Sequence, residues 1–190
     1  TGDLIKFREQ GSNGLTTDQQ GHLVLCQHGD RQIATLVRRV GVTGTYAPLV
    51  SRFGPRRFNS PNDLVFSRKG GLYFTDPPYG LRDPKKRELD FSGVYRIAAD
   101  GKLSLVERGV PFPNGLAFSP DESRLYVVDS EANHILVFDV RADGSVGPSR
   151  LFAEVNLAGS HEGPDGLKID ARGNLFVAGP DGVWILSPAG

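Results

Sequence analysis

The sequence is poor in sulfur and carries no net charge. Its 190 residues include one cysteine, Cys26, one tryptophan and no methionine, and 22 basic residues balance 22 acidic ones. A single cysteine excludes an internal disulfide framework and is compatible with either the cytoplasm or an exported location. The balanced charge disfavours nucleic acid and anionic membrane surfaces as partners. No stretch approaches the roughly 18 consecutive apolar residues of a membrane-spanning helix.

The chain is instead rich in turn-forming residues. It has 24 glycines and 13 prolines spread along its length, which is typical of many short elements joined by tight turns and disfavours long helices. One pattern occurs four times, about every 50 residues, which is the period of a propeller blade. Each copy begins with Asn or Asp, continues with a short apolar run, and reaches a second apolar run after a polar turn. The leading residues of the copies are Asn13, Asn62, Asn114 and Asp165.

The apolar runs predict an all-β propeller. They are short, rich in Val, Ile, Leu, Phe and Tyr, and bounded by turn formers, as strands in hairpins are. Further candidates, 93–97 with 103–106 and 134–138 with 150–153, bring each complete repeat to about four strands, the number in a propeller blade. Asp-Gly pairs at Asp100-Gly101 and Asp143-Gly144 supply the turns between these candidates.

The number of repeats predicts a piece of a larger ring. Closed propellers typically hold about four to eight blades, and the chain carries about four leading strands. We therefore expect a single propeller domain over residues 1–190 that is incomplete at both ends, with Thr1–Phe7 as the outer part of an earlier blade. Because the chain holds no methionine, we do not expect Thr1 to be the native start of translation.

The repeat also predicts where the chemistry lies. First strands line the central channel of a propeller, so equivalent residues at their starts face one mouth. Asn13, Asn62, Asn114 and Asp165 should therefore converge, and their amide and carboxylate oxygens suit a hard divalent cation. Asn-Gly and Asp-Gly also form ordinary turns in which the side chain bonds its own backbone. The repeat alone leaves both interpretations open.

Other polar residues lie near the same mouth. His28 and Asp76, at the ends of second strands, are candidates to bind a substrate hydroxyl or orient a ligand, although such residues more often cap a strand. His161 and Glu162 are candidates for proton transfer on a loop. Cys26 is interpreted as a buried small hydrophobe. The sequence has no phosphate-binding loop, paired-cysteine zinc pattern or serine-nucleophile elbow.

Four motifs together resemble one known family. They are Ser60-Pro61-Asn62-Asp63-Leu64, Tyr73-Phe74-Thr75-Asp76-Pro77-Pro78-Tyr79-Gly80, Pro113-Asn114-Gly115-Leu116-Ala117-Phe118-Ser119 and Pro164-Asp165-Gly166-Leu167. Over essentially its whole length, the chain is similar to the family of senescence marker protein (SMP-30), gluconolactonase and luciferin-regenerating enzyme. The resemblance implies a six-bladed β-propeller with a divalent cation at the channel mouth. Calcium is the first candidate, with magnesium, manganese or zinc as alternatives.

The resemblance also implies roles for three residues. Asn114 and Asp165 would be metal ligands, and Asp165 would be the catalytic proton donor or acceptor. Asn62 would bind the substrate or complete the metal shell. The family's further ligand, a glutamate in a Glu-Gly-Pro segment near the N-terminus, has no counterpart before Asn13, so the chain as given lacks one ligand. Glu162-Gly163-Pro164 repeats those letters at a different place, directly before Asp165. Animal members carry an arginine where this chain has Ser60.

The function implied by this resemblance is metal-dependent hydrolysis of a lactone ring. The substrate would be a small molecule, such as a sugar lactone that opens to an aldonic acid. A cation would polarise the carbonyl and activate a water molecule, and Asp165 would act as general base and then general acid. Two alternatives remain: a non-catalytic propeller that binds a ligand or protein, and a propeller with chemistry like that of strictosidine synthase.

Overall fold

The regular secondary structure of the described residues is almost entirely β-strand. A computed structural model describes residues 11–41, 43–81, 83–160 and 162–190. These residues form four sheets of consecutive antiparallel strands, here numbered blades 1 to 4 in chain order, together with a two-stranded ribbon and one 3₁₀ turn. The all-β propeller predicted from the repeats is therefore confirmed, with four blades in the described chain. A ring of six blades stays a prediction.

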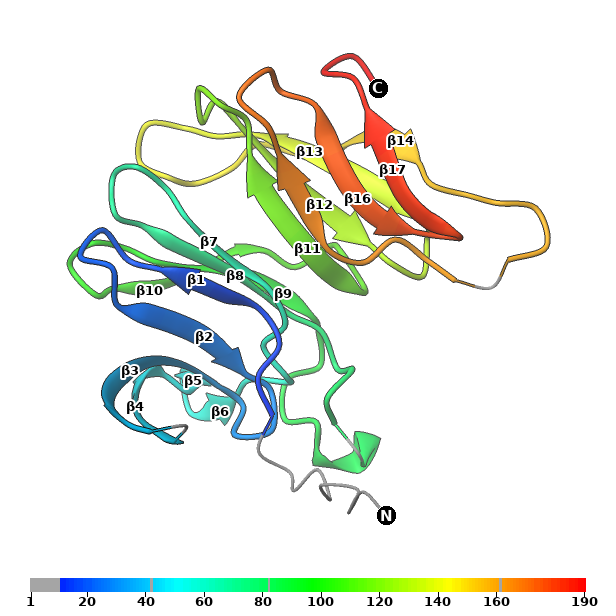
Figure 1. The fold of residues 1–190 in the computed structure, drawn as a ribbon. Coiled ribbons are helices and arrows are strands. Elements are labelled where there is room, and N and C mark those ends of the chain that lie inside the picture. The colour runs from blue at the N-terminus through cyan, green and yellow to red at the C-terminus, as the bar shows by residue number, and fades with distance from the viewer. Residues whose placement is uncertain (1–10, 42, 82, 161) are drawn as a thin grey trace.

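The strands follow the order of the repeats. Blade 1 contains β1 (Leu15–Thr17), β2 (Leu23–Gln27), β3 (Gln32–Val40) and β4 (Thr43–Val50), and blade 2 contains β7 (Leu64–Phe66), β8 (Leu72–Asp76), β9 (Gly93–Ile97) and β10 (Leu103–Glu107). Blade 3 contains β11 (Pro113–Phe118), β12 (Arg124–Asp129), β13 (His134–Asp139) and β14 (Arg150–Glu154), and blade 4 contains β15 (Leu167–Ile169), β16 (Leu175–Gly179) and β17 (Gly182–Leu186). The ribbon is β5 (Arg52–Phe53) with β6 (Arg56–Arg57), and the 3₁₀ turn is η1 (Pro84–Lys86). Figure 1 shows the four blades following one another in an arc.

The central strands of blades 2 and 3 are apolar on both faces because each of these blades packs between two neighbours. Successive residues of a strand point to opposite faces of its sheet. In β8, Phe74 packs into the core between blades 1 and 2, and Tyr73 packs into the core between blades 2 and 3. In β12, Val127 and Val128 likewise belong to the cores on the two sides of blade 3. Strands buried on both faces therefore appear in the sequence as continuous apolar runs.

The first strands of the blades lie side by side. β1 contacts β7, and β11 contacts both β7 and β15. The Gly14 N–H donates to the Asn62 carbonyl at 2.7 Å, and the Gly115 N–H donates to the Asp165 carbonyl at 3.1 Å. A Cβ atom on Gly115 would lie 2.5 Å from the Leu167 backbone nitrogen, so this close approach requires glycine. The glycine that follows a leading residue thus serves the contact between blades.

The junction between blades 2 and 3 uses a side chain instead. Asp63 occupies the position that is glycine at the other two junctions. The fully buried Thr75 hydroxyl donates to the Asn114 carbonyl at 2.9 Å and accepts from the Asp63 N–H at 3.1 Å. The hydroxyl therefore bridges the two blades at the junction where glycine is replaced by Asp63.

Some elements match the sequence pattern and others do not. Gly101 and Gly144 have φ angles of +83° and +82°, as the predicted Asp-Gly turns require. The long hairpin β3–β4 was not predicted, because its outer half carries charged and exposed side chains rather than an apolar run. The expected outer strand at Thr1–Phe7 lies outside the described residues. Within the described ranges, no helix is long and apolar enough to cross a membrane.

Candidate active site

A cavity of about 950 Å³ lies where blades 2, 3 and 4 meet. It is lined by Asn62, Tyr79, Asn114, Ser130, Glu131, Asn133, Ser160, Glu162, Gly163, Pro164, Asp165, Ala178 and Gly179. Three of the four leading residues of the repeats, Asn62, Asn114 and Asp165, thus lie on one cavity. The fourth, Asn13, is exposed and does not line it, because blade 1 lies beyond blade 2 from this point of the arc.

The backbone of each leading residue is fixed by its neighbours. The Asn62 N–H donates to the Thr75 carbonyl at 2.9 Å, and the Asp165 N–H donates to the Ala178 carbonyl at 2.8 Å, so each is tied to the second strand of its own blade. The carbonyls of Asn62, Asn114 and Asp165 accept the bonds from the preceding blade described above. Their side chains are therefore presented from positions that two blades hold in place.

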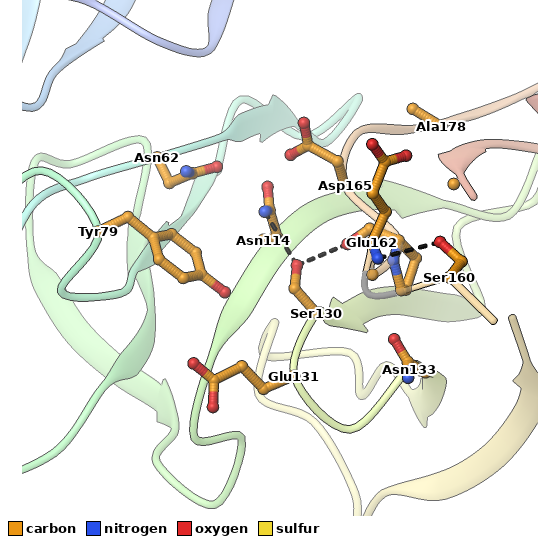
Figure 2. Close-up of a pocket in the computed structure, with 13 residues that line it drawn as sticks. Asn62, Tyr79, Asn114, Ser130, Glu131, Asn133, Ser160, Glu162, Asp165 and Ala178 are labelled. Atoms are coloured by element: carbon orange, nitrogen blue, oxygen red, sulfur yellow. Dashed lines mark hydrogen bonds between the residues drawn. The ribbon is translucent and has the colours of Figure 1, made fainter. Parts of the chain in front are cut away.

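The side chains of these residues are not used in turns. Asn62 is only 6% exposed, yet none of the described residues forms a hydrogen bond with its amide group. Asn114 is 8% exposed, and its Nδ2 donates to the Ser130 hydroxyl at 3.0 Å. Figure 2 shows the oxygens of Asn62, Asn114 and Asp165 turned toward the space between them. Local turn bonding is found instead at Asp63, whose Oδ1 accepts from the Leu64 N–H at 2.9 Å.

The cavity is electronegative and rich in oxygen donors. Its described lining includes three carboxylates, Glu131, Glu162 and Asp165, and no lysine, arginine or histidine. Among the described residues, no three His, Cys, Asp or Glu side chains are grouped closely enough to hold a metal by themselves. The donor set is mixed, with amide oxygens beside a carboxylate, which suits calcium or another hard divalent cation. The largely buried Asn62 amide, which bonds to none of the described residues, fits a ligand at this position.

Several residues of the cavity, among them Tyr79, Ser130 and Glu131, were not singled out from the sequence. Ser130 and Glu131 directly follow β12, and Tyr79 lies in the loop after β8. The Tyr79 ring stacks on Phe112 with centroids 6.0 Å apart, and its hydroxyl donates to the Phe112 carbonyl at 3.2 Å. Burial raises the pKa of Tyr79. The sequence pattern predicts that second strands end at the same mouth, so residues after them are expected near the cavity. The pattern does not show which of their side chains face it.

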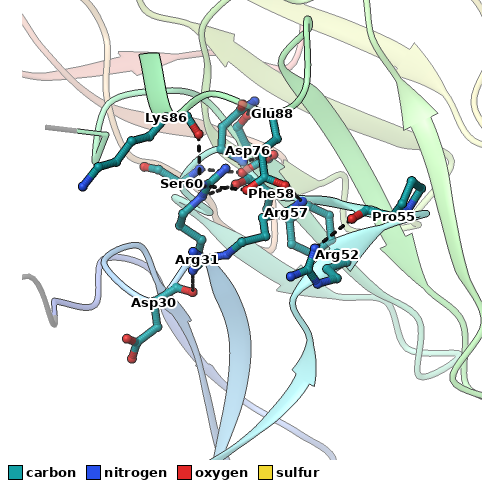
Figure 3. Close-up of polar contacts among 11 residues, drawn as sticks. Asp30, Arg31, Arg52, Pro55, Arg57, Phe58, Ser60, Asp76, Lys86 and Glu88 are labelled. Carbon is teal, nitrogen blue, oxygen red and sulfur yellow. Dashed lines mark hydrogen bonds and ion pairs between the residues drawn. The ribbon is translucent and has the colours of Figure 1, made fainter. Parts of the chain in front are cut away.

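Asp76 fixes the backbone next to the site without lining the cavity. It is fully buried and does not line the cavity. Its carboxylate accepts from the Asn59 N–H at 2.8 Å and from the Ser60 N–H at 2.7 Å, which fixes the segment that leads to Asn62. Burial raises the pKa of Asp76 to about 7, against the lowering effect of these two bonds and of Arg31. Figure 3 shows this polar cluster. Asp76 therefore acts on the site only through the 59–60 backbone that leads to Asn62.

Of the remaining candidates from the sequence, most lie apart from the cavity or outside the described residues. His28 packs against Gly80 and does not line the cavity. Ser60, at the position of the animal arginine, is buried, and its hydroxyl accepts from the Gly80 N–H at 2.7 Å. Cys26 is fully buried in the core between blades 1 and 2, as predicted, and burial raises the pKa of its thiol. Glu162 lines the cavity, whereas His161 lies outside the described residues.

The family of the chain is shown by comparisons with known proteins. The model for the SMP-30/gluconolactonase/LRE-like region matches residues 1–190. A gluconolactonase from Zymomonas mobilis is 40% identical over 197 residues, covering 97% of this chain and 54% of that protein. Lactonase drp35 from Staphylococcus saprophyticus is 32% identical over 179 residues, covering 93% and 52% respectively. A solved gluconolactonase from Xanthomonas campestris has a TM-score of 0.81 and 38% identity, covering 94% of this chain and 59% of that one. The chain spans about half the length of the curated relatives it matches.

Proposed function

Because the chain belongs to the SMP-30/gluconolactonase/LRE-like family, we propose that the complete protein hydrolyses the ring ester of a lactone. A sugar lactone of the gluconolactone type is the proposed substrate, in line with the gluconolactonases among its relatives. The observation that carries the proposal is the position of Asn62, Asn114 and Asp165 on one cavity, with side-chain oxygens that no described residue engages.

Asn114 and Asp165 would hold a divalent cation, with calcium as the first candidate and magnesium, manganese or zinc as alternatives. Both residues present hard oxygen atoms, and Asp165 supplies a negative charge. When bound, such a cation polarises a carbonyl and lowers the pKa of water. Glu162 and Glu131 on the same cavity add to the negative potential that attracts the cation.

Asp165 would transfer the proton during ring opening. Its carboxylate accepts a proton from the attacking water as the new bond forms at the lactone carbonyl carbon. When the bond between this carbon and the ring oxygen breaks, Asp165 returns the proton to the ring oxygen. The products are a carboxylic acid and a hydroxyl group on one open chain, and no covalent bond to the protein is needed. Asn62 would hold the substrate by a hydrogen bond to one of its hydroxyl groups.

The described lining favours an uncharged, hydroxylated lactone. Its three carboxylates would repel a substrate phosphate or carboxylate, and no described basic side chain on the cavity would offset that repulsion. The Ser60 hydroxyl is occupied by Gly80 and is buried. Substrate selection would therefore depend on Asn62 and the residues that follow the second strands, such as Tyr79.

The test measures hydrolysis of glucono-1,5-lactone by the complete gene product in a pH-stat. The protein is first treated with a chelator, and calcium, magnesium, manganese or zinc is then added back. The Asp165→Asn substitution keeps an oxygen for the cation but removes the proton acceptor, so we expect kcat to fall by about 10²- to 10⁴-fold. Asp100→Asn is the matched control, because it makes the same substitution at an exposed residue of a hairpin turn.

The outcomes separate the alternatives. Full activity in the Asp165→Asn variant would show that the carboxylate is not the proton-transfer group. If the unsubstituted protein binds calcium but opens none of several lactones, the non-catalytic binding propeller replaces the lactonase proposal. Loss of activity in Asp100→Asn to the same degree would attribute the effect to folding rather than to the site.

A further inference from the structure

Ser130 connects the two proposed metal ligands. It follows β12 in blade 3, lines the cavity, and lies between Asn114 of blade 3 and Pro164 at the entry to blade 4. Its hydroxyl donates to the Pro164 carbonyl at 2.5 Å, and the Asn114 Nδ2 donates to the same hydroxyl oxygen at 3.0 Å. Figure 2 draws both bonds on one side chain. One hydroxyl therefore contacts Asn114 and the residue directly before Asp165.

The hydrogen-bond chemistry of the hydroxyl determines the orientation of the Asn114 amide. A serine hydroxyl has a single proton, and the Pro164 carbonyl, which is only an acceptor, takes it. The Ser130 oxygen must then accept from Asn114, and only the NH₂ group of the amide can donate. The amide oxygen consequently faces away from Ser130, toward the space that it shares with Asn62 and Asp165. This assignment follows from donor and acceptor capacity, because amide oxygen and nitrogen have almost the same shape.

Close contacts fix the position of the Ser130 backbone. A Cβ atom on Gly163 would lie 2.1 Å from the Ser130 carbonyl oxygen, so the approach of the 163–164 segment depends on glycine. The Ser130 N–H donates to the Phe112 carbonyl at 3.2 Å, which anchors Ser130 to the residue before β11. The backbone of Ser130 is thus held on both sides, which keeps its hydroxyl close to Asn114 and Pro164.

We propose that Ser130 is a positioning residue, which holds the Asn114 amide so that its oxygen rather than its NH₂ group faces the cation. The inference rests on the proposed function, because it takes Asn114 as a ligand. Without the hydroxyl, the amide is free to rotate by half a turn and present NH₂ hydrogens to a positive charge. Groups that orient a metal ligand typically contribute about 10- to 100-fold in affinity.

The test compares two substitutions of nearly equal shape, Ser130→Thr and Ser130→Val, in the complete gene product. Calcium is titrated by calorimetry into chelated protein, and thermal melting without calcium measures the structural effect separately. We expect Ser130→Val to raise the Kd for calcium by about 10- to 100-fold, and Ser130→Thr, which keeps the hydroxyl, to stay within about threefold of the unsubstituted protein.

A second background isolates the orientation of the amide from a simple clamp between blades. In the Asn114→Asp background, the two side-chain oxygens are equivalent and rotation presents no NH₂ group. We therefore expect Ser130→Val to change the Kd for calcium by less than about threefold there. An equal loss of affinity in both backgrounds would overturn the proposal and leave Ser130 as a structural clamp.

The remaining outcomes distinguish this inference from the proposed function. If Asn114→Ala binds calcium as tightly as the unsubstituted protein, Asn114 is not a ligand, and the metal assignment of the proposed function is wrong. If Asn114→Ala loses calcium binding but the Thr and Val variants of Ser130 bind it equally, only the positioning role of Ser130 is wrong.

Discussion

Asp76 illustrates how a single buried carboxyl couples the fold to pH. Its pKa is raised to about 7 by burial, whereas the ordinary value is 3.8. Between these two values the folded protein holds a proton that the unfolded chain has released. The free energy of unfolding should therefore fall as pH rises from about 4 to 7, by up to about 1.4 kcal/mol per pH unit. Surface carboxyls titrate in a different pH range. Hydrogen bonds lower the pKa of Asp121 to about 2, below the window in which Asp76 releases its proton.

The Asp76→Asn substitution tests this coupling. The amide does not titrate, so we expect the stability of the variant to depend less on pH between 4 and 7. It also presents an NH₂ group to one of the two backbone N–H donors at Asn59 and Ser60, so we expect a loss of about 1–3 kcal/mol at pH 5. Urea denaturation at several pH values in this window measures both effects.

The control for Asp76→Asn is Asp90→Asn, because the Asp90 side chain is 78% exposed. We expect this variant to follow the pH dependence of the unsubstituted protein. An unchanged pH dependence in Asp76→Asn would mean that the two backbone bonds keep Asp76 ionised in spite of its burial.

At the scale of strands, the first and second strands were predictable and the outer ones less so. β7, β8, β11 and β12 lie between two blades, so both faces are buried and the apolar run is continuous. The outer hairpin β3–β4 lacks this signal, because its buried side chains among the described residues, Ile33 and Ala34, lie at the start of β3. Local pattern therefore predicts the elements that carry the interfaces between blades.

The contact between β11 and β15 depends on Gly115. A Cβ atom there would lie 2.6 Å from the Asp165 carbonyl oxygen and 2.5 Å from the Leu167 nitrogen. We expect Gly115→Ala to push the two strands apart and to lower the free energy of unfolding by about 1–3 kcal/mol. The neighbouring Gly166 is a matched control, since a Cβ atom there meets nothing within 4 Å. Gly166→Ala should change stability by less than about 0.5 kcal/mol in the same chemical denaturation experiment. Equal stability of the two variants would contradict the close-packing argument.

At the scale of the whole molecule, the site was predictable to the extent that it follows the repeat. Asn62, Asn114 and Asp165 hold equivalent positions in three blades, so a period in the sequence is enough to propose that they meet. Ser130 and Tyr79 hold positions with no shared residue type in the other blades. Their place on the cavity depends on how blades 2, 3 and 4 pack, which no local pattern contains.

The same geometry predicts that a cation stabilises the arrangement of the blades. The proposed cation would contact Asn114 of blade 3 and Asp165 of blade 4, and these positions exist together only in the folded protein. A ligand that binds only the folded state at about 100 times its Kd adds about 2.7 kcal/mol to the free energy of unfolding. Calcium added to the chelated complete protein should therefore raise its Tm, and Asp165→Ala should abolish most of this increase, while Asp100→Asn keeps it. Circular dichroism melting at several calcium concentrations measures the effect. An equal rise in Tm for Asp165→Ala would place the stabilising cation elsewhere in the molecule, because removing a ligand of the bound site must weaken the linkage between binding and folding.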